Sequence, residues 1–194
     1  ITAIAAEKLK LRPGDLVMSD FDGTITKRDT GWVVFDELGL DEAWDWEYRW
    51  RDQEISSMEC LSGQWSLVDL PPDEMLALID TLETDERFPE FVQRARAVGA
   101  EVVVASDGLS FYLDRLMERM GFEICEGDPD PEDPRECIAR YVNRAELTPE
   151  GVKITSALSL IEPLLFRARR RLCARRWCMN ATPRAGGRRR RDPA

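Results

Sequence analysis

The stretch DFDGT at residues 20–24 places two carboxylates two positions apart, directly before a glycine and a threonine. In nearly extended backbone, residues i and i+2 point to the same side, so Asp20 and Asp22 can both face one reacting group. A carboxylate can attack a phosphoryl group and form an aspartyl-phosphate, while a second carboxyl group protonates the leaving alkoxide. The spacing therefore indicates phosphoryl transfer, with Asp20 as the nucleophile and Asp22 as the general acid and base.

Groups that could bind the phosphate lie in two places. Gly23 lets backbone N–H groups come close to an anion, and the Thr24 hydroxyl can donate a further hydrogen bond. A second polar cluster supplies the hydroxyl group of Ser106 and the backbone N–H groups of Asp107 and Gly108. We expect the two clusters to surround one phosphate.

A divalent cation is expected at the two aspartates, because two carboxylates and a phosphate repel one another. Hard oxygen ligands favour Mg²⁺, with Asp20 and Asp22 as its protein ligands. A calcium-binding loop is excluded as an alternative, because such a loop needs Gly at its sixth position and Glu at its twelfth, where this chain has Ile25 and Gly31. A plain solvated turn stays open as the alternative without chemistry.

Both polar clusters follow short apolar runs that are typical of buried strands. Residues 16–18 come after the turn signal RPGD, and residues 102–105 lead into the second cluster. Apolar residues at helical spacing fill residues 88–98 and 112–120, and a glycine closes each run. The order strand, insertion, helix, strand, helix predicts an α/β fold with a Rossmann-like parallel sheet, in which ligands bind at the carboxyl ends of the strands.

The insertion at residues 30–82 contains five of the six tryptophans and stretches compatible with helix. It predicts a small helical cap inserted into a core made of residues 1–29 and 83–166. Its aromatic residues could line a substrate pocket, although a core for the cap itself is the use that we favour. Residues 143–155 have the Pro-Glu-Gly turn and the alternation of a β-hairpin.

The composition narrows the class of chemistry. The 194 residues include no histidine, which excludes Ser-His-Asp catalysis and His-ligated metal sites.

No apolar run reaches the roughly 20 residues of a membrane span, so we expect a cytoplasmic protein. The chain begins at Ile1 rather than Met, which leaves two explanations open, a fragment that lacks an upstream segment and a processed start. The five cysteines are scattered, and we favour reduced, buried thiols over a disulfide or a metal site.

The C-terminal segment differs in character from the rest. The net charge of the whole chain is −10, yet residues 167–194 contain eleven arginines and one acid. Three explanations stay open: a basic tail that binds nucleic acid or acidic surfaces, an interaction tail unrelated to catalysis, and a non-native terminus created by a reading-frame shift. We favour the frameshift, because the tail has no lysine and consists mainly of residues with GC-rich codons.

The motifs SDFDGTIT and VVVASDGLSFY resemble the first and second motifs of the haloacid dehalogenase superfamily, phosphatase branch. The helical insertion resembles a cap of the phosphoserine phosphatase type. The stretches DFDGTIT, EISSMECLSGQW, FPEFV and SDGLSFYLDRL, with the hairpin, are similar to the phosphatases of methionine salvage that act on 2-hydroxy-3-keto-5-methylthiopentenyl-1-phosphate. This resemblance implies a Mg²⁺-dependent phosphomonoester hydrolase whose substrate is a small phosphorylated metabolite.

Two later motifs of that family have no clear counterpart. The family uses a lysine that braces the phosphate, and here the only lysine after Ser106 is Lys153, on a predicted hairpin strand. The family's acidic metal motif follows that lysine, whereas Asp128 precedes it, in a proline-rich acidic loop. The competing hypothesis is therefore an inactive relative that retains the fold and at most binds phosphate.

Overall fold

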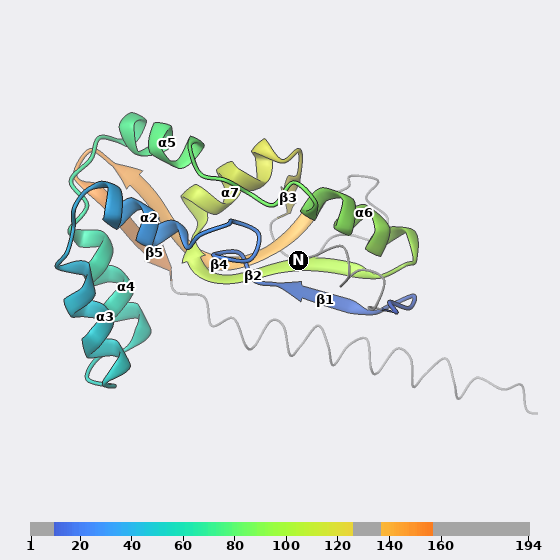
Figure 1. Ribbon diagram of the computed structural model, residues 1–194, viewed down its shortest axis with the longest axis horizontal. Helices are drawn as coiled ribbons and strands as arrows, with labels where there is room; N and C mark the ends of the chain where they lie inside the picture. The colour runs from blue at the N-terminus through green and yellow to red at the C-terminus, as the bar shows by residue number, and fades with distance from the viewer. Residues whose placement is uncertain (1–9, 126–136, 157–194) are drawn as a thin grey trace, which may run out of the picture. The chain divides into compact units, whose positions relative to one another are not determined.

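A computed structural model of the chain describes residues 10–125 and 137–156 (Figure 1). All of these residues fall in one compact unit, residues 1–160. Asp128 with its acidic loop and the Arg-rich tail at residues 167–194 lie outside the described residues. The predicted division into core and cap stays a prediction.

The predicted α/β fold with a parallel sheet is confirmed. The sheet has the spatial order β1 (Leu16–Ser19), β2 (Glu101–Leu109), β4 (Cys137–Thr148) and β3 (Glu123–Cys125), all parallel, and β5 (Gly151–Ser156) pairs antiparallel with β4. The two apolar runs pair directly, with Val17 opposite Val102. The predicted hairpin is also confirmed, as β4 and β5.

Strand β2 is longer than its apolar run. It continues through Ser106, Asp107 and Gly108 to Leu109, and its register with β4 shifts between Ala105 and Leu109. A shift of this kind bends a strand and changes the direction in which its side chains point. The second polar cluster therefore lies within the irregular end of β2 and not in a loop beyond it.

Six helices lie in the described residues. They are α2 (Thr30–Glu37), α3 (Ala43–Arg51), α4 (Ser57–Ser66), α5 (Pro72–Asp80), α6 (Phe88–Ala97) and α7 (Ser110–Arg119). The two helices expected after residue 83 are confirmed as α6 and α7. The segment 30–82 is helical as predicted, and local signals fix its helix starts: Asp29 caps α2 by accepting the Trp32 N–H at 2.9 Å, and Ser56 with Glu59 forms a capping box at α4.

The core is shared by the sheet and the helices. The fully buried apolar side chains of these elements include Val103 and Val104 of β2, Val92 of α6, and Leu113 and Met117 of α7. The apolar run of β2 is continuous because a central parallel strand buries both faces. None of the helices in the described parts is long and apolar enough to cross a membrane.

Helix α7 is tied to its neighbours by two bidentate ion pairs. Arg115 binds Asp80 of α5 at 2.7 and 2.5 Å, and Arg140 of β4 binds Asp114 through two hydrogen bonds, one of them 2.6 Å long. The first pair is exposed and stabilises weakly, whereas the Arg140 side chain is only 12% exposed. The second pair therefore does more to hold α7 against the sheet.

The carboxyl ends of β1 and β2 point toward the helices of the 30–82 segment (Figure 1). The first of these helices, α2, follows β1 after a turn at residues 20–29, and α3 and α4 lie beyond the same end of the sheet. In an open α/β sheet this is the edge at which ligands bind.

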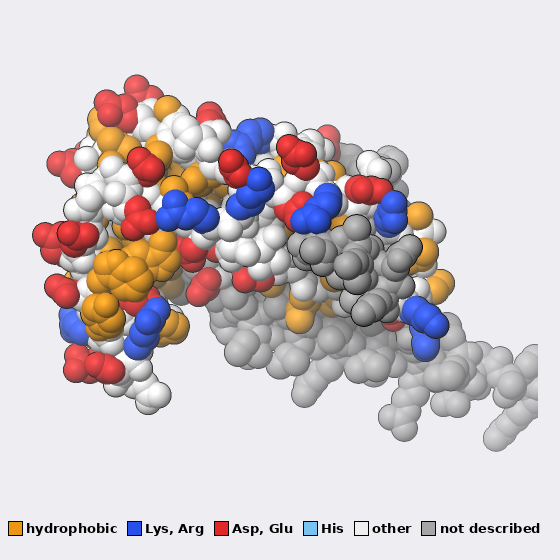
Figure 2. Space-filling view, in the orientation of Figure 1, with side chains coloured by type: hydrophobic (Ala, Val, Ile, Leu, Met, Phe, Trp, Pro, Cys, Tyr) orange, Lys and Arg blue, Asp and Glu red, His pale blue; other side chains and the backbone are white. Residues whose placement is uncertain are grey.

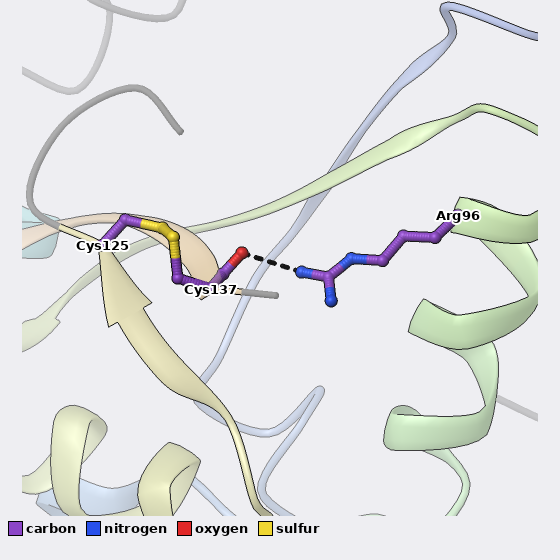
Figure 3. The surroundings of a disulfide bond; sticks show 3 residues. All are labelled: Arg96, Cys125 and Cys137. Atoms are coloured by element: carbon purple, nitrogen blue, oxygen red, sulfur yellow. Dashed lines mark hydrogen bonds between the residues drawn. A yellow bond between two sulfur atoms is a disulfide. The ribbon is translucent and has the colours of Figure 1, made fainter. Parts of the chain in front are cut away.

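The expectation of reduced cysteines is wrong for one pair. Cys125 ends β3 and Cys137 begins β4, and the two form a disulfide with their Cα atoms 5.4 Å apart (Figure 3). Parallel pairing of β3 with β4, with Cys125 opposite Ala139, brings the two side chains together. Arg96 of α6 donates to the Cys137 carbonyl oxygen at 2.8 Å. The sequence offered no signal for this pairing, because only the sheet register makes these cysteines neighbours.

Reduction of this bond should destabilise the fold. The cross-link spans a sequence separation of 12 residues, and a closed loop of that size is worth about 3 kcal/mol through restriction of the unfolded chain. We expect dithiothreitol to lower the free energy of unfolding by about that amount in a denaturant titration. The control is the double variant Cys125→Ser, Cys137→Ser, which should no longer respond; an unchanged wild-type titration would contradict the prediction.

Candidate active site

Asp22 is the centre of the polar cluster at the end of β1. Its Oδ1 atom accepts a hydrogen bond from the Thr30 backbone N–H at 3.0 Å. Its Oδ2 atom accepts from the Tyr112 hydroxyl at 3.0 Å and from the Ser106 hydroxyl at 3.4 Å. The carboxylate is thus held from three directions, by α2, α7 and β2. These contacts join the two sequence motifs, which are 84 residues apart.

The surroundings of Asp22 favour its neutral form. Burial raises the pKa of Asp22 to about 6, the hydrogen bonds from Thr30 and Tyr112 oppose that shift, and the nearby Asp29 carboxylate adds to it. Tyr112 is buried, and burial together with the charge of Asp22 raises the pKa of its phenol well above the usual value. Tyr112 therefore stays a neutral donor, and Asp22 can hold or release a proton near neutral pH.

Gly108 allows this contact because it has no side chain. A Cβ atom at this position would lie 2.5 Å from Asp22 Oδ2 and would overlap the Tyr112 hydroxyl oxygen. The Gly108 backbone N–H donates to the Ser106 hydroxyl oxygen at 3.0 Å, which orients that hydroxyl group within the cluster. The SDG sequence therefore packs β2 closely against the first motif.

Gly108→Ala should disrupt the site. We expect a cost of about 1–3 kcal/mol in unfolding free energy, because the methyl group overlaps two buried groups, and a loss of turnover as Asp22 is displaced. Denaturant titration and phosphate release measure the two effects. Gly31→Ala is the control, since its Cβ would have nearest neighbours at 3.4 and 3.5 Å. Wild-type stability and turnover in Gly108→Ala would contradict the described contact.

The other predicted phosphate ligands lie in two places, the pocket wall and the turn after β1. Asp107 lines the pocket described below, and its backbone carbonyl oxygen accepts from the Asn143 side chain at 2.6 Å. Gly23 has a φ of +69°, a conformation that favours glycine, and its N–H donates to Thr26 Oγ1 at 3.0 Å. The Thr24 N–H donates to the Phe21 carbonyl oxygen at 3.2 Å. Both N–H groups thus bond within the turn, and the predicted phosphate-binding roles of Gly23 and of the Thr24 hydroxyl stay predictions.

Asp20 is exposed at the end of β1, and its Oδ1 atom accepts from the Phe21 backbone N–H at 2.7 Å. It does not line the pocket that Asp22 lines. Lys153 is an exposed residue of β5 opposite Glu146, and it does not line this pocket either. Of the charged candidates, the structure therefore brings Asp22 and Asp107 to one cavity and leaves Asp20 and Lys153 outside its wall.

A pocket of about 480 Å³ opens between the polar cluster and helices α2, α3 and α4. Asp22, Asp107 and Gly108 form its wall on the sheet side. Its opposite wall is largely aromatic and aliphatic, and includes Trp32, Phe35, Trp50, Met58, Leu61 and Trp65. A volume of this size fits a small metabolite.

The aromatic wall reaches the molecular surface. Trp32 stacks on Trp44 with ring centroids 3.9 Å apart, and Trp44 stacks on Tyr48 at 5.9 Å. Figure 2 shows hydrophobic side chains gathered over α2 and α3, with acidic side chains beside them. Deeper in, Trp65 is 2% exposed and packs edge-on against Phe35. Trp65 belongs to the core that the helices share with the sheet, and Trp65, Trp32 and Trp50 line the pocket. A separate core for the cap and a substrate in this pocket stay predictions.

The donor set at the end of β1 suits Mg²⁺. This ion commonly takes one or two carboxylates and completes its shell with phosphate oxygens and water. Burial raises the pKa values of both Asp22 and Asp29, and the charge of Asp107 adds to the shift of Asp29. These shifts indicate negative charge that a cation would stabilise. In the described ranges, no three acidic, histidine or cysteine side chains surround one point. The assignment of Asp20 and Asp22 as the residues that would hold the ion stays a prediction.

Two residues of the site were missed at the level of sequence. Tyr112 was recognised only as an apolar position of a helix, although a buried tyrosine hydroxyl needs a partner. Asn143 is 7% exposed on β4, lines the pocket and donates to Asp107. The rule that ligands meet the carboxyl ends of parallel strands could have directed attention to it, had β4 been recognised as a parallel strand.

Comparison with known proteins gives the same fold and related sequences. No protein-family model matches the chain. The 2-hydroxy-3-keto-5-methylthiopentenyl-1-phosphate phosphatase of Bacillus cereus (strain B4264) is 31% identical over 104 residues, which are 53% of this chain and 48% of that protein. The phosphatase of the same name from Lysinibacillus sphaericus (strain C3-41) is 28% identical over 141 residues, 72% of this chain and 56% of its own length. The chain thus spans about half the length of these curated relatives.

Solved structures agree with the fold. A had family hydrolase from Salmonella enterica serovar Typhi has a TM-score of 0.64 at 15% identity, over 82% of this chain and 53% of its own. A phospho-aspartyl intermediate analogue of phosphoserine phosphatase has a TM-score of 0.55 at 19% identity, over 74% and 64%. These structures share the fold of this chain, and its sequence is similar to those of the two phosphatases.

Proposed function

We propose that this protein hydrolyses phosphomonoesters of small metabolites through an aspartyl-phosphate on Asp20. The observation that carries the proposal is the position of Asp22, held by Ser106 and Tyr112 in the wall of a metabolite-sized pocket, two residues from a second, exposed carboxylate. The names of the sequence relatives support the reaction class. They also support a substrate related to methionine salvage.

The proposed reaction has two displacements at phosphorus. An Asp20 carboxylate oxygen attacks the phosphorus atom, the P–O bond to the alcohol breaks, and Asp22 gives its proton to the departing oxygen. Asp22 then takes a proton from water as that water attacks the aspartyl-phosphate, which releases phosphate and restores the Asp20 carboxylate. A carboxyl group whose pKa is about 6 suits both proton transfers, since each form is populated near neutral pH.

The chain's own groups would position the reactants. The Tyr112 hydroxyl and the Thr30 N–H fix the Asp22 carboxyl group, and Ser106 is the nearest hydroxyl group from the second motif. Mg²⁺ bound by Asp20 and Asp22 would supply charge stabilisation for the phosphoryl oxygens. The aromatic side of the pocket would exclude water from around the alcohol part of the substrate.

Phosphate release from a generic aryl phosphate tests this proposal. We expect the purified chain of residues 1–194 to release phosphate with saturating Mg²⁺, and we expect EDTA to abolish the release, with recovery when Mg²⁺ is added back. Circular dichroism in both conditions controls for folding. A folded sample that releases no phosphate from any small ester would refute the proposal and favour an inactive relative that at most binds phosphate.

A further inference from the structure

The pocket beside Asp22 has an unusual balance of charge for a site that handles phosphate esters. Four of its lining residues are acidic, Asp22, Asp29, Glu47 and Asp107, and among the described residues that line it none is lysine or arginine. Arg51 pairs with Glu47 at 2.8 Å, but its own side chain is 56% exposed and it does not line the pocket. The cavity therefore repels an anionic group on the alcohol part of a substrate.

The far side of the same pocket carries aromatic side chains. Trp32, Trp50 and Trp65 come from three different helices and line one cavity together with Glu47. The Trp50 indole N–H donates to the Ser57 hydroxyl at 3.0 Å, which fixes the orientation of this ring at the pocket wall. Aromatic faces combined with a carboxylate recognise ammonium groups, quaternary ones especially, because the ring quadrupole and the carboxylate both attract a positive charge that is only weakly hydrated.

The carboxylates of the pocket act on one another as well. Burial raises the pKa of Asp29, and the charges of Asp107 and Glu47 add to that shift. Burial and the charge of Glu47 raise the pKa of the Cys60 thiol to about 11. The two positive charges of a Mg²⁺ ion would offset the roughly two negative charges of a phosphoryl group. The net charge of the pocket would therefore stay negative when both are bound. A cationic group on the substrate would offset this negative charge.

We propose that the preferred substrates are phosphate esters of amino alcohols, with the ammonium group held between Glu47 and the faces of Trp32 and Trp50. This inference rests on the proposed phosphatase function and narrows it to a substrate class. The phosphoryl group lies at Asp20 and Asp22, and the cationic end lies on the side of α3 and α4. A carboxylate on the alcohol, as in phosphoserine, finds no basic partner in the described wall of the pocket.

Three esters of similar size test the charge preference. They are phosphocholine, dimethylbutyl phosphate, in which a carbon atom replaces the quaternary nitrogen, and phosphoserine. We expect kcat/KM for phosphocholine to exceed that for the neutral isostere by roughly tenfold, and phosphoserine to be the poorest of the three. Equal values for the first two esters, or a preference for phosphoserine, would overturn the inference while leaving the phosphatase function intact.

The variant Glu47→Gln removes the negative charge of this side chain and keeps its shape. Glutamine keeps an acceptor for Arg51, so the fold should be retained, and we expect kcat/KM to fall several-fold for phosphocholine and to stay unchanged for dimethylbutyl phosphate. The control is Asp45→Asn, which makes the same charge change at an exposed position of α3 outside the pocket and should alter neither ester. An equal loss for both esters in Glu47→Gln would overturn the role of the charge.

A binding experiment tests the inference even if no ester is hydrolysed. Because three tryptophans line the pocket, choline chloride should change the tryptophan fluorescence in a saturable way, more tightly than dimethylbutanol and less tightly in Glu47→Gln. That result without hydrolysis would refute the phosphatase proposal and keep the cation site. Choline that binds no better than dimethylbutanol would overturn the cation site itself.

Discussion

Replacement of Asp20 by Asn is expected to reduce phosphate release by roughly a thousandfold or more, because an amide cannot take the place of the attacking carboxylate. The loss should appear in kcat and not only in KM, since the residue forms and breaks a bond. Steady-state kinetics on an aryl phosphate with saturating Mg²⁺ measures the effect.

The fold should tolerate this change. Asp20 is exposed, and its carboxylate accepts a hydrogen bond from the adjacent Phe21 N–H, which the Asn side-chain oxygen can also accept. The hydrogen bond from the Ser19 hydroxyl goes to the Asp20 backbone carbonyl oxygen and is not affected by the substitution. Asp45→Asn, at an exposed site on α3, is the matched control and should keep wild-type turnover. Asp20→Asn with near wild-type kcat would refute the role of this carboxylate as nucleophile.

Asp22→Asn should abolish most of the turnover and at the same time stabilise the metal-free protein. The loss of a general acid and base costs roughly 10²–10⁴-fold in rate. The gain in stability follows because the variant removes a negative charge that burial and Asp29 destabilise, while the amide oxygen can still accept from the Thr30 N–H. We expect about 1–3 kcal/mol in unfolding free energy at about pH 8.

The sign of the pH dependence follows from the pKa of Asp22, which is about 6 in the folded protein against 3.8 for an ordinary aspartate. The folded state binds this proton more tightly than the unfolded chain, so the wild-type protein loses stability as the pH rises between these two values. Asparagine does not titrate. The advantage of Asp22→Asn should therefore be full above the folded-state pKa and vanish below the unfolded-state value.

Denaturant titrations in EDTA across this pH range check the prediction. Asp20→Asn provides the control, since it also removes one carboxylate from the same turn but not from a buried position. A variant Asp22→Asn that is less stable than the wild type at about pH 8 would show that the Asp22 charge is well solvated in the folded state.

The sequence predicted those parts of the fold that local patterns encode. The apolar runs before the two polar clusters became adjacent parallel strands, and the periodic runs closed by Gly99 and Gly121 became α6 and α7. The Pro-Glu-Gly turn became the β4–β5 hairpin. In each case, residues close together in the chain carry the signal, so pattern and structure agree.

The parts that sequence did not predict depend on contacts between distant segments. The Cys125–Cys137 bond depends on the register of β3 with β4, and the contact of Asn143 with Asp107 depends on the pairing of β2 with β4. The bonding of the Gly23 N–H within its own turn also needed coordinates, because the sequence shows that a glycine can approach an anion but not which acceptor it finds.

The candidate site was predicted in its residues more than in its arrangement. Ser106 does meet Asp22, as expected for the ends of neighbouring parallel strands. The prediction that Asp20 and Asp22 face one reacting group assumed an extended chain, whereas the strand ends at Ser19 and a turn follows, so that prediction now depends on the turn and stays untested. The Tyr112 hydroxyl, hidden in a helical pattern of apolar residues, proved to be a direct partner of Asp22.

The measurement that tests the central claim most directly is a search for the phosphorylated aspartate itself. The purified chain of residues 1–194 is mixed with Mg²⁺ and an excess of aryl phosphate, quenched in acid during turnover, digested and analysed by mass spectrometry. We predict the added mass of one phosphoryl group on the peptide that contains Asp20, sensitive to hydroxylamine and absent from Asp20→Asn. Turnover without any phosphorylated peptide, or with the phosphoryl group on another residue, would contradict the assignment of Asp20 as the nucleophile.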